Sequence, residues 1–160
     1  MFLFINKLDF IFKDIGVVHN ERNERIDDNW GNVISKIILN EEIPAEAVNN
    51  IFEFSHIEVI YFFHLINENE EMNFERIPRG LENLYPVGIF SQRASKRPNK
   101  IGNSICELVD VNNKIIIVKG LDALNNSPVI DIKPVYSCFL PEKSRIKEPE
   151  WVRIITKNYW

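Results

Sequence analysis

Short hydrophobic runs alternate with polar and turn-forming residues along most of the chain, which is typical of β-strands rather than long helices. Within several runs apolar and polar positions alternate, as on a strand that buries one face. The predicted strands cover Asp9–His19, Val33–Asn40, His56–Ile66, Ser104–Val111, Lys114–Leu121, Pro128–Val135 and Glu150–Trp160. Asn112 and Asn113 separate two of these runs and predict a tight hairpin turn.

The segments between these runs predict little helix. Pro44 and Glu46 are placed to open a short helix within Ile43–Phe54. Asn20–Asn32 is polar and predicts a loop, and Asn67–Tyr85 predicts a long loop of the kind that is often functional. There is no internal repeat, low-complexity tract or linker, so residues 1–160 are predicted to form a single domain. The predicted fold is mainly β: a small closed or nearly closed β-barrel with one or two short helices.

Positive charge is concentrated in one segment of an acidic chain. The formal net charge is -4 at pH 7, so the surface as a whole does not attract nucleic acid. The segment Gly88–Ser104 nevertheless gathers four cations, Arg93, Lys96, Arg97 and Lys100, and its internal proline forbids a continuous helix. From these residues two interpretations stay open: a solvated basic loop, or a site for a phosphate or carboxylate.

A second segment, Gly120–Pro134, carries Asp122 and Asp131 near its ends. Asp122, Asn125 and Asn126 are residue types that make local backbone hydrogen bonds in turns. Taken alone, an ordinary turn therefore accounts for this segment.

Several other kinds of site are not indicated. His56 and His64 lie eight residues apart on one predicted strand, about 26 Å at strand geometry, which is too far to share an ion, so no metal is predicted. His64 is interpreted as a residue at the edge of the core. The chain has no Gly-x-Gly-x-x-Gly, no Walker-type lysine and no Gly-x-Ser-x-Gly, which argues against a Rossmann site, a P-loop site and a serine hydrolase.

The cysteines and the first residues bear on the compartment. Cys106 and Cys138 both sit in apolar runs, which predicts buried free thiols, with a single disulfide as the alternative. The opening "MFLFINKLDFIF" is too short and too interrupted for a membrane span and lacks the order of a signal peptide. A cytoplasmic protein without a membrane partner is therefore expected.

Four segments, taken in order, resemble the TsaA-like family. They are "IGVVH" (Ile15–His19), "FEFSHIEVIYFFH" (Phe52–His64), "GIFSQRASKRPNKIGNS" (Gly88–Ser104) and "GLDALNNSPVIDIKP" (Gly120–Pro134). The resemblance covers about residues 15–134 and leaves 1–14 and 135–160 as flanking segments. It implies a small β-barrel that binds S-adenosylmethionine without a Rossmann fold, in a homodimer whose cofactor site lies near the subunit interface. The implied activity is methylation of N6 of the threonylcarbamoyl-adenosine at position 37 of tRNA, in the anticodon loop.

The resemblance also implies site residues, carried over position by position. The implied cofactor-binding residues are Ser55, His56, Arg93, Asn103, Asp122, Ala123, Leu124 and Asn125. A carboxylate suits ribose hydroxyls and an arginine grips a carboxylate, so the residue types fit that role. Asp131, and second His56, are the candidates for the base that removes the N6 proton. The residues expected to face the anticodon phosphates are Lys96, Arg97, Asn99, Lys100 and Lys133.

Three positions depart from the family pattern. His19–Glu21 stands where the family often has Ser-Pro-Tyr, Lys100 follows Asn99 where a proline is usual, and Asn125-Asn126 replaces Asp-Gly. Asparagine tolerates left-handed backbone geometry, so the last turn is expected to survive. Longer members carry a C-terminal domain where this chain has about two dozen residues, and a changed substrate is expected if that domain holds the tRNA.

Two alternatives to tRNA methylation stay open on the sequence. The barrel could be an S-adenosylmethionine-binding regulatory module that makes no RNA contact, or a methyltransferase for another small substrate. Phosphate contacts weaken steeply with salt, so salt-dependent tRNA binding distinguishes the regulatory module from a tRNA-modifying enzyme.

Overall fold

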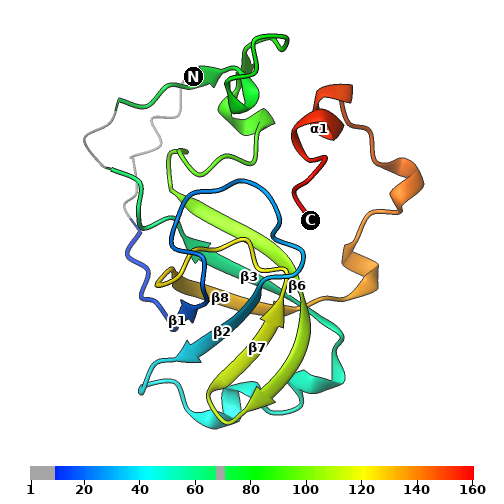
Figure 1. Ribbon diagram of the computed structural model, residues 1–160. Coiled ribbons are helices and arrows are strands. Elements are labelled where there is room, and N and C mark those ends of the chain that lie inside the picture. Colours follow the sequence, from blue (N-terminus) through cyan, green and yellow to red (C-terminus); the bar gives the residue numbers. More distant parts are fainter. Residues whose placement is uncertain (1–9, 68–70) are drawn as a thin grey trace, which may run out of the picture.

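The computed structural model, which describes residues 10–67 and 71–160, contains a closed barrel of six antiparallel strands (Figure 1). The strands are β1 (Gly16–His19), β2 (Ile34–Leu39), β3 (His56–Phe62), β6 (Ile101–Asn112), β7 (Ile115–Lys119) and β8 (Pro128–Pro134). Their order around the barrel is β1-β2-β7-β6-β3-β8, and pairing of Gly16 with Val129 closes it. The predicted fold, a small mainly-β barrel, is confirmed.

Strict alternation of side chains along β3 builds one side of the core. Ile57, Val59 and Tyr61 point inward and are almost fully buried, whereas Glu58 and Ile60 between them are only half-buried. The other strands contribute the same kind of residue, chiefly Val18, Ile37, Cys106, Ile116, Val118 and Val129. The barrel interior is therefore packed with side chains, and a ligand has to bind at its ends or on its outer surface.

A β-bulge explains why the hydrophobic residues of the last predicted strand are not cleanly sorted. Ile60 pairs with Asp131, but the next residue, Tyr61, pairs with Val129, so Ile130 is an extra residue in β8. The bulge changes the alternation within β8, so Val129 is buried and its apolar neighbours are only half-buried.

The short elements outside the barrel match the sequence less well. They are β4 (Glu75–Arg76), β5 (Val87–Gly88), the 3-10 helices η1 (Ala45–Val48), η2 (Ile51–Glu53), η3 (Pro78–Gly80), η4 (Ile89–Ser91), η5 (Ser137–Phe139) and η6 (Lys143–Arg145), and the helix α1 (Glu150–Ile155). η1 and η2 lie where a short helix was expected. The described part of the long loop predicted over Asn67–Tyr85 contains β4 and η3. β4 forms because it pairs with β5, which follows the predicted loop in the sequence.

The strand predicted over Glu150–Trp160 is wrong, because its first half is helix α1. Pro149 precedes the helix, Glu150 lies in its first turn and Arg153 in its last, an order that suits the helix dipole. Trp151 is buried. The segment from 135 to 149 runs away from the barrel, and α1 returns the chain so that its end points back toward the strands (Figure 1).

Other limits and burial differ from the expectations in detail. Of the strand predicted over Asp9–His19, only Gly16–His19 is strand; Asp9 lies outside the described residues. β3 ends at Phe62 rather than Ile66, and β6 begins at Ile101. Cys106 is buried as predicted and both cysteines are free thiols. The prediction for Cys138 is wrong, because η5 lies outside the barrel and exposes it.

Candidate functional site

The basic segment and the end of β3 enclose a pocket of about 380 Å³, called here the basic pocket. Five of the predicted site residues line it: Arg93, Arg97, Asn99, Asn103 and Asp122. Its apolar walls are the rings of Tyr61, Phe63 and Phe90. The structure thus brings together residues that are up to about 60 positions apart in the sequence, and combines two guanidinium groups with a carboxylate and aromatic faces.

Hydrogen bonds hold the cationic side of this pocket in place. Arg93 donates from Nη2 to the backbone carbonyl of Asn103, 2.6 Å away. Asn103 in turn donates from Nδ2 to a carboxylate oxygen of Glu58 at 2.7 Å. Arg93 is exposed and anchored through one nitrogen, so the rest of its donor fork faces the pocket and solvent.

A second and smaller cavity, about 80 Å³, lies beside the first and is mainly apolar; it is called here the apolar pocket. The turn residues Asp122, Ala123 and Leu124 form one wall, and Trp30 and His64 lie on others. Burial, and secondarily the nearby Arg25 guanidinium, lower the pKa of His64 below its ordinary 6.5. His64 is therefore neutral at physiological pH, with Nδ1 3.3 Å from the hydroxyl of Ser127.

Asp122 lines both pockets and is held by two tyrosines. Tyr61 donates its hydroxyl proton to the Asp122 backbone carbonyl, and Tyr159 donates to a side-chain oxygen. Burial, and then the Asp122 charge, raise the pKa of both phenols, so both stay protonated donors. Burial raises the pKa of Asp122 itself from 3.8 to about 6, although the Tyr159 bond and Arg93 oppose this rise.

The residues that replace the usual Ser-Pro-Tyr support the same turn. The Asn20 side chain donates to the backbone carbonyl of Ala123 at 2.9 Å and to the hydroxyl of Ser35 at 2.8 Å. Asn125 accepts from the Asn20 backbone N–H at 3.3 Å, and Asn126 has a left-handed φ of 64°. The turn from Asp122 to Asn126 therefore keeps an ordered geometry despite both departures.

Two predicted cofactor residues lie elsewhere. Ser55 and His56 are exposed at the start of β3, with the Ser55 hydroxyl 2.9 Å from Nδ1 of His56. Tyr61, on the pocket wall, is five residues further along this strand, which corresponds to about 16 Å. The structure does not bring Ser55 and His56 together with Arg93 and Asp122.

The remaining predicted residues lie on the loop and on the outer face of the barrel. Asp131 and Lys133 form an ion pair on β8, and Lys133 is paired across the strands with Glu58. Neither lines the basic pocket or the apolar pocket. Lys100 donates from Nζ to the carbonyl of Ile66 at 3.3 Å, and Lys96 lies half-buried in the basic segment.

The sequence did not identify several residues of this site. They are Arg25, Trp30, Tyr61, Phe63, His64, Phe90 and Tyr159. His64 was interpreted as a core-edge residue because nothing in its immediate sequence points to a ligand. The signal that could have found Phe63 and His64 is their position. They lie toward the end of a predicted strand that begins at the polar pair Ser55-His56, and they end the same motif.

Comparison with known proteins identifies the fold family. The sequence model described as the tRNA-methyltransferase O N-terminal domain matches residues 26–139, more than half of the chain. The chain belongs to this family. The resemblance to the TsaA-like family is thereby confirmed, and the matched residues contain every lining residue of both pockets except Arg25.

Relatives share the family's central part with this chain. A probable S-adenosyl-L-methionine-binding protein of Methanothermobacter thermautotrophicus is 45% identical over 91 residues, which cover 57% of this chain and 62% of the relative. A protein of the same description from Pyrococcus abyssi is 33% identical over 138 residues, 82% of this chain and 68% of the relative. The tRNA (adenine(37)-N6)-methyltransferase of Escherichia coli is 36% identical over 94 residues, 56% of this chain and 40% of the enzyme.

Solved structures agree on the fold. A crystal structure of TrmO from Pseudomonas aeruginosa superimposes with a TM-score of 0.71 and 22% identity, covering 92% of this chain and 63% of that one. The chain thus spans less than two thirds of this structure and of the Methanothermobacter relative, and less than half of the Escherichia coli enzyme.

Proposed function

We propose that this protein is an S-adenosylmethionine-dependent methyltransferase that acts on N6 of threonylcarbamoyl-adenosine at position 37 of tRNA. One observation carries the proposal: Asp122 is shared by two adjoining pockets, and the larger of them is bordered by the basic segment. Such a pair of cavities suits a methyl donor and a methyl acceptor that meet across one wall. Relatives whose names describe a tRNA methyltransferase and S-adenosylmethionine-binding proteins support the same activity.

The residues around Asp122 fit S-adenosylmethionine, which supplies the methyl group. Asp122 is partly buried and its carboxylate accepts one bond from Tyr159, which leaves lone pairs for the hydroxyls of a ribose. Arg93 offers a guanidinium fork for the carboxylate of the methionine part. The turn residues Ala123, Leu124 and Asn125 would hold the ligand against the apolar pocket. Holding donor and acceptor in one geometry is the main catalytic gain open to such a site.

The basic segment would contact the RNA. Arg97 and Asn99 line the basic pocket, and Lys96 and Lys100 belong to the same loop. Lys133 lies on the outer face of β8 and would extend the contact if the RNA crosses that face. With these cations concentrated there, the rest of the acidic surface would stay clear of the polyanion. We expect tRNA binding to weaken steeply with increasing salt concentration.

The base that takes the proton from N6 is also part of the proposal. Asp131 remains the first candidate and His56 the second, both of them on the outer side of the barrel strands. Asp131 is ion-paired with Lys133, which holds its carboxylate in place on this face of β8. Replacing each by its neutral isostere, Asp131→Asn and His56→Gln, should lower the rate of transfer without lowering cofactor affinity if it serves as the base.

The proposed assembly is a cytoplasmic homodimer. Exposed apolar side chains support association. Phe90, at the basic pocket, is 77% exposed, and Ile105, on β6, is 45% exposed. Among the described residues no helix is long and apolar enough to cross a membrane, and no cluster of three or more potential ligands is arranged for a metal ion. Light scattering of the purified protein measures the number of subunits directly.

The cofactor part of the proposal is tested by calorimetric titration with S-adenosylmethionine. We expect saturable binding by the natural protein and at least tenfold weaker binding by Arg93→Ala, because the variant loses the charge-assisted bonds to the carboxylate. Arg145→Ala is the matched control, because the Arg145 side chain is 79% exposed, forms an ion pair with nearby Glu142 and lines neither pocket. Saturable cofactor binding with no salt-dependent tRNA binding would favour the regulatory module instead.

A further inference from the structure

The last described residues of the chain lie across a loop that forms a wall of the apolar pocket. The backbone N–H of Asn29 donates to the carbonyl of Asn158 at 2.8 Å, and that of Trp30 to the carbonyl of Tyr159 at 2.7 Å. Trp30 is buried and its side chain lines the pocket. The segment 158–160, called here the strap, therefore fixes the backbone of one pocket wall.

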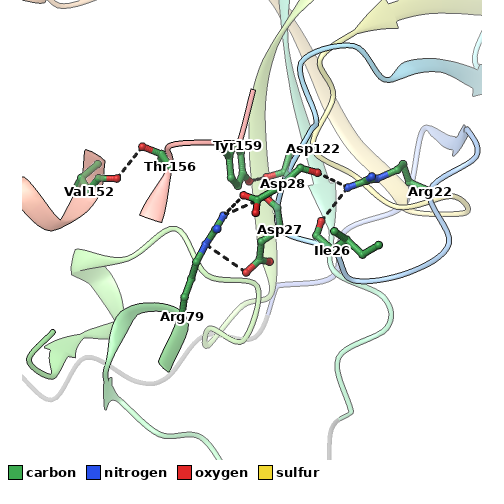
Figure 2. Close-up of polar contacts among 9 residues, drawn as sticks. All are labelled: Arg22, Ile26, Asp27, Asp28, Arg79, Asp122, Val152, Thr156 and Tyr159. Atoms are coloured by element: carbon green, nitrogen blue, oxygen red, sulfur yellow. Dashed lines mark hydrogen bonds and ion pairs between the residues drawn. The ribbon is translucent and has the colours of Figure 1, made fainter. Parts of the chain in front are cut away.

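The same strap reaches the opposite wall through a side chain. Figure 2 shows the Tyr159 ring pointing toward Asp122, where its hydroxyl donates to Oδ2. Tyr159 lines neither pocket, so both cavities stay open while this bond is made. One residue thus contacts Trp30 through its carbonyl and Asp122 through its hydroxyl, and joins two walls that are about 90 residues apart in the sequence.

A third segment braces the strap from outside. Arg79 lies in η3 and forms ion pairs with Asp28 at 2.9 Å and with Asp27 at 3.6 Å (Figure 2). Its guanidinium carbon is 5.9 Å from the centre of the Tyr159 ring, within the range of a cation–π contact. Asp27 also lines the apolar pocket, so the loop and Tyr159 are held against each other by the same arginine.

We infer that Tyr159 is a positioning residue for the ligand site: the strap holds the Asp122 carboxylate and the Trp30 wall in the geometry that binds S-adenosylmethionine. The inference rests on the proposed function for the identity of the ligand. It assigns a role to a residue outside the part that the family model matches. The alternative is that Tyr159 competes with the ligand. In that case its hydroxyl would have to leave the Asp122 carboxylate before the ligand could bind there. The open pockets favour positioning over competition.

The charged surroundings of Asp122 define a readout that a general loss of packing would not reproduce. The groups that act on it are the Tyr159 hydroxyl, Arg93 and Arg22, which favour the ionised carboxylate, and Asp27, which opposes it. Removing only the Tyr159 hydroxyl should therefore raise the pKa of Asp122 above about 6 and move the lower pH limit of ligand binding upward.

The first test compares Tyr159→Phe with Tyr85→Phe, a control in which the tyrosine is 62% exposed. Affinity for S-adenosylmethionine is measured by calorimetry between pH 5 and 8, and the Asp122 carboxyl carbon is titrated by NMR without ligand. We expect about five- to tenfold weaker binding by Tyr159→Phe, the size of one ordinary lost hydrogen bond, and a raised Asp122 pKa. Tighter binding would show that Tyr159 competes with the ligand, and unchanged affinity with an unchanged Asp122 pKa would show no role; either result overturns the inference.

A second variant displaces the strap without changing Tyr159. A Cβ on Gly31 would lie 2.7 Å from the carbonyl carbon of Trp160, so Gly31→Ala must push the strap away. Gly88→Ala is the matched control, because the nearest atom to its added Cβ is 4.0 Å away. Gly31→Ala should weaken binding as much as Tyr159→Phe, and the double variant should be no weaker than either, because both break one unit. Fully additive losses would contradict this.

The two proposals fail in distinguishable ways. If the natural protein binds no S-adenosylmethionine, the proposed function fails. The ligand-free NMR titration then still decides whether Tyr159 controls Asp122, and hydrogen exchange at the Asn29 and Trp30 amides still decides whether Gly31→Ala releases the strap. Binding by the natural protein with full affinity in both variants would leave the proposed function standing and remove the inference.

Discussion

Tyr61, buried inside the barrel, donates its hydroxyl proton to the backbone carbonyl of Asp122. This bond links the core of the fold to the turn that both pockets share. Tyr61 points inward because it follows Ile57 and Val59 at every second position of β3. The position of the proposed ligand site is therefore set by the same alternation that builds the core.

Loss of the Tyr61 hydroxyl should destabilise the protein and loosen the turn. Tyr61→Phe leaves the Asp122 carbonyl without its partner in a buried environment, which costs about 1–3 kcal/mol in the free energy of unfolding. Urea denaturation measures this loss, with Tyr136→Phe as the control, since Tyr136 is 47% exposed. Equal stability of Tyr61→Phe and the control would show that the bond contributes nothing.

Gly102 is required by the same ring. A Cβ at Gly102 would lie 2.5 Å from two atoms of the Tyr61 ring and 2.9 Å from the Phe63 ring. We expect Gly102→Ala to tilt both rings, to destabilise the fold by about 1–3 kcal/mol and to weaken ligand binding in the basic pocket. Thermal unfolding and a ligand titration check the two effects, and a variant as stable and as active as the natural protein would contradict the close packing.

Ionisation of Asp122 should lower stability as the pH rises. The unfolded carboxyl ionises near its ordinary pKa of 3.8, whereas the folded one ionises at about 6. Between these values the folded state holds a proton that the unfolded state has lost, so the free energy of unfolding falls as the pH rises through this window, by at most about 3 kcal/mol.

Asp122→Asn removes this titration. We expect the variant to be more stable than the natural protein at pH 7.5, to match it more closely near pH 4, and to bind S-adenosylmethionine more weakly. Denaturation midpoints across pH 4 to 8 test the prediction. The prediction is contradicted if the free energy of unfolding changes between pH 4 and 6 by the same amount in the natural protein and in Asp122→Asn.

Lys100 occupies a backbone conformation that the family's usual proline does not reach. Its φ is 50°, whereas proline is fixed near about -65°, and its N–H donates to the Arg97 carbonyl at 3.1 Å. Lys100→Pro should therefore destabilise the basic segment by about 3 kcal/mol or more, and Lys100→Gly should be neutral or stabilising in the left-handed region. Unfolding measurements on both variants decide this, and a stable Lys100→Pro would mean that the loop has a different path.

The sequence was sufficient for the barrel because its strands are short, regularly bounded and alternating. β2, β7 and β8 lie within or almost at the predicted limits. The prediction failed at the end of the chain, where Ile154, Ile155 and Trp151 resemble a strand in composition but follow the capping pattern of a helix. A short apolar segment is compatible with either a strand or a helix. Pro149, directly before Glu150, is the residue that favours the start of a helix here.

The site was predicted where its residues are contiguous in a motif and missed where tertiary structure assembles it. Arg93, Asn103 and Asp122 come from two long motifs and meet in the basic pocket. Trp30 and Tyr159 have no local pattern that points to a ligand, because their place depends on how the strap crosses a loop more than 120 residues earlier. Ser55 and His56 belong to a motif but lie at the other end of β3.

The central claim is that this protein methylates tRNA with S-adenosylmethionine. The most direct measurement incubates the protein with methyl-labelled S-adenosylmethionine and tRNA that carries threonylcarbamoyl-adenosine, followed by nucleoside digestion and mass spectrometry. The account predicts label on that one nucleoside, with loss of the label in Arg93→Ala and retention in Arg145→Ala. Cofactor binding without any labelled nucleoside would contradict the account and leave a binding module as the function of the barrel.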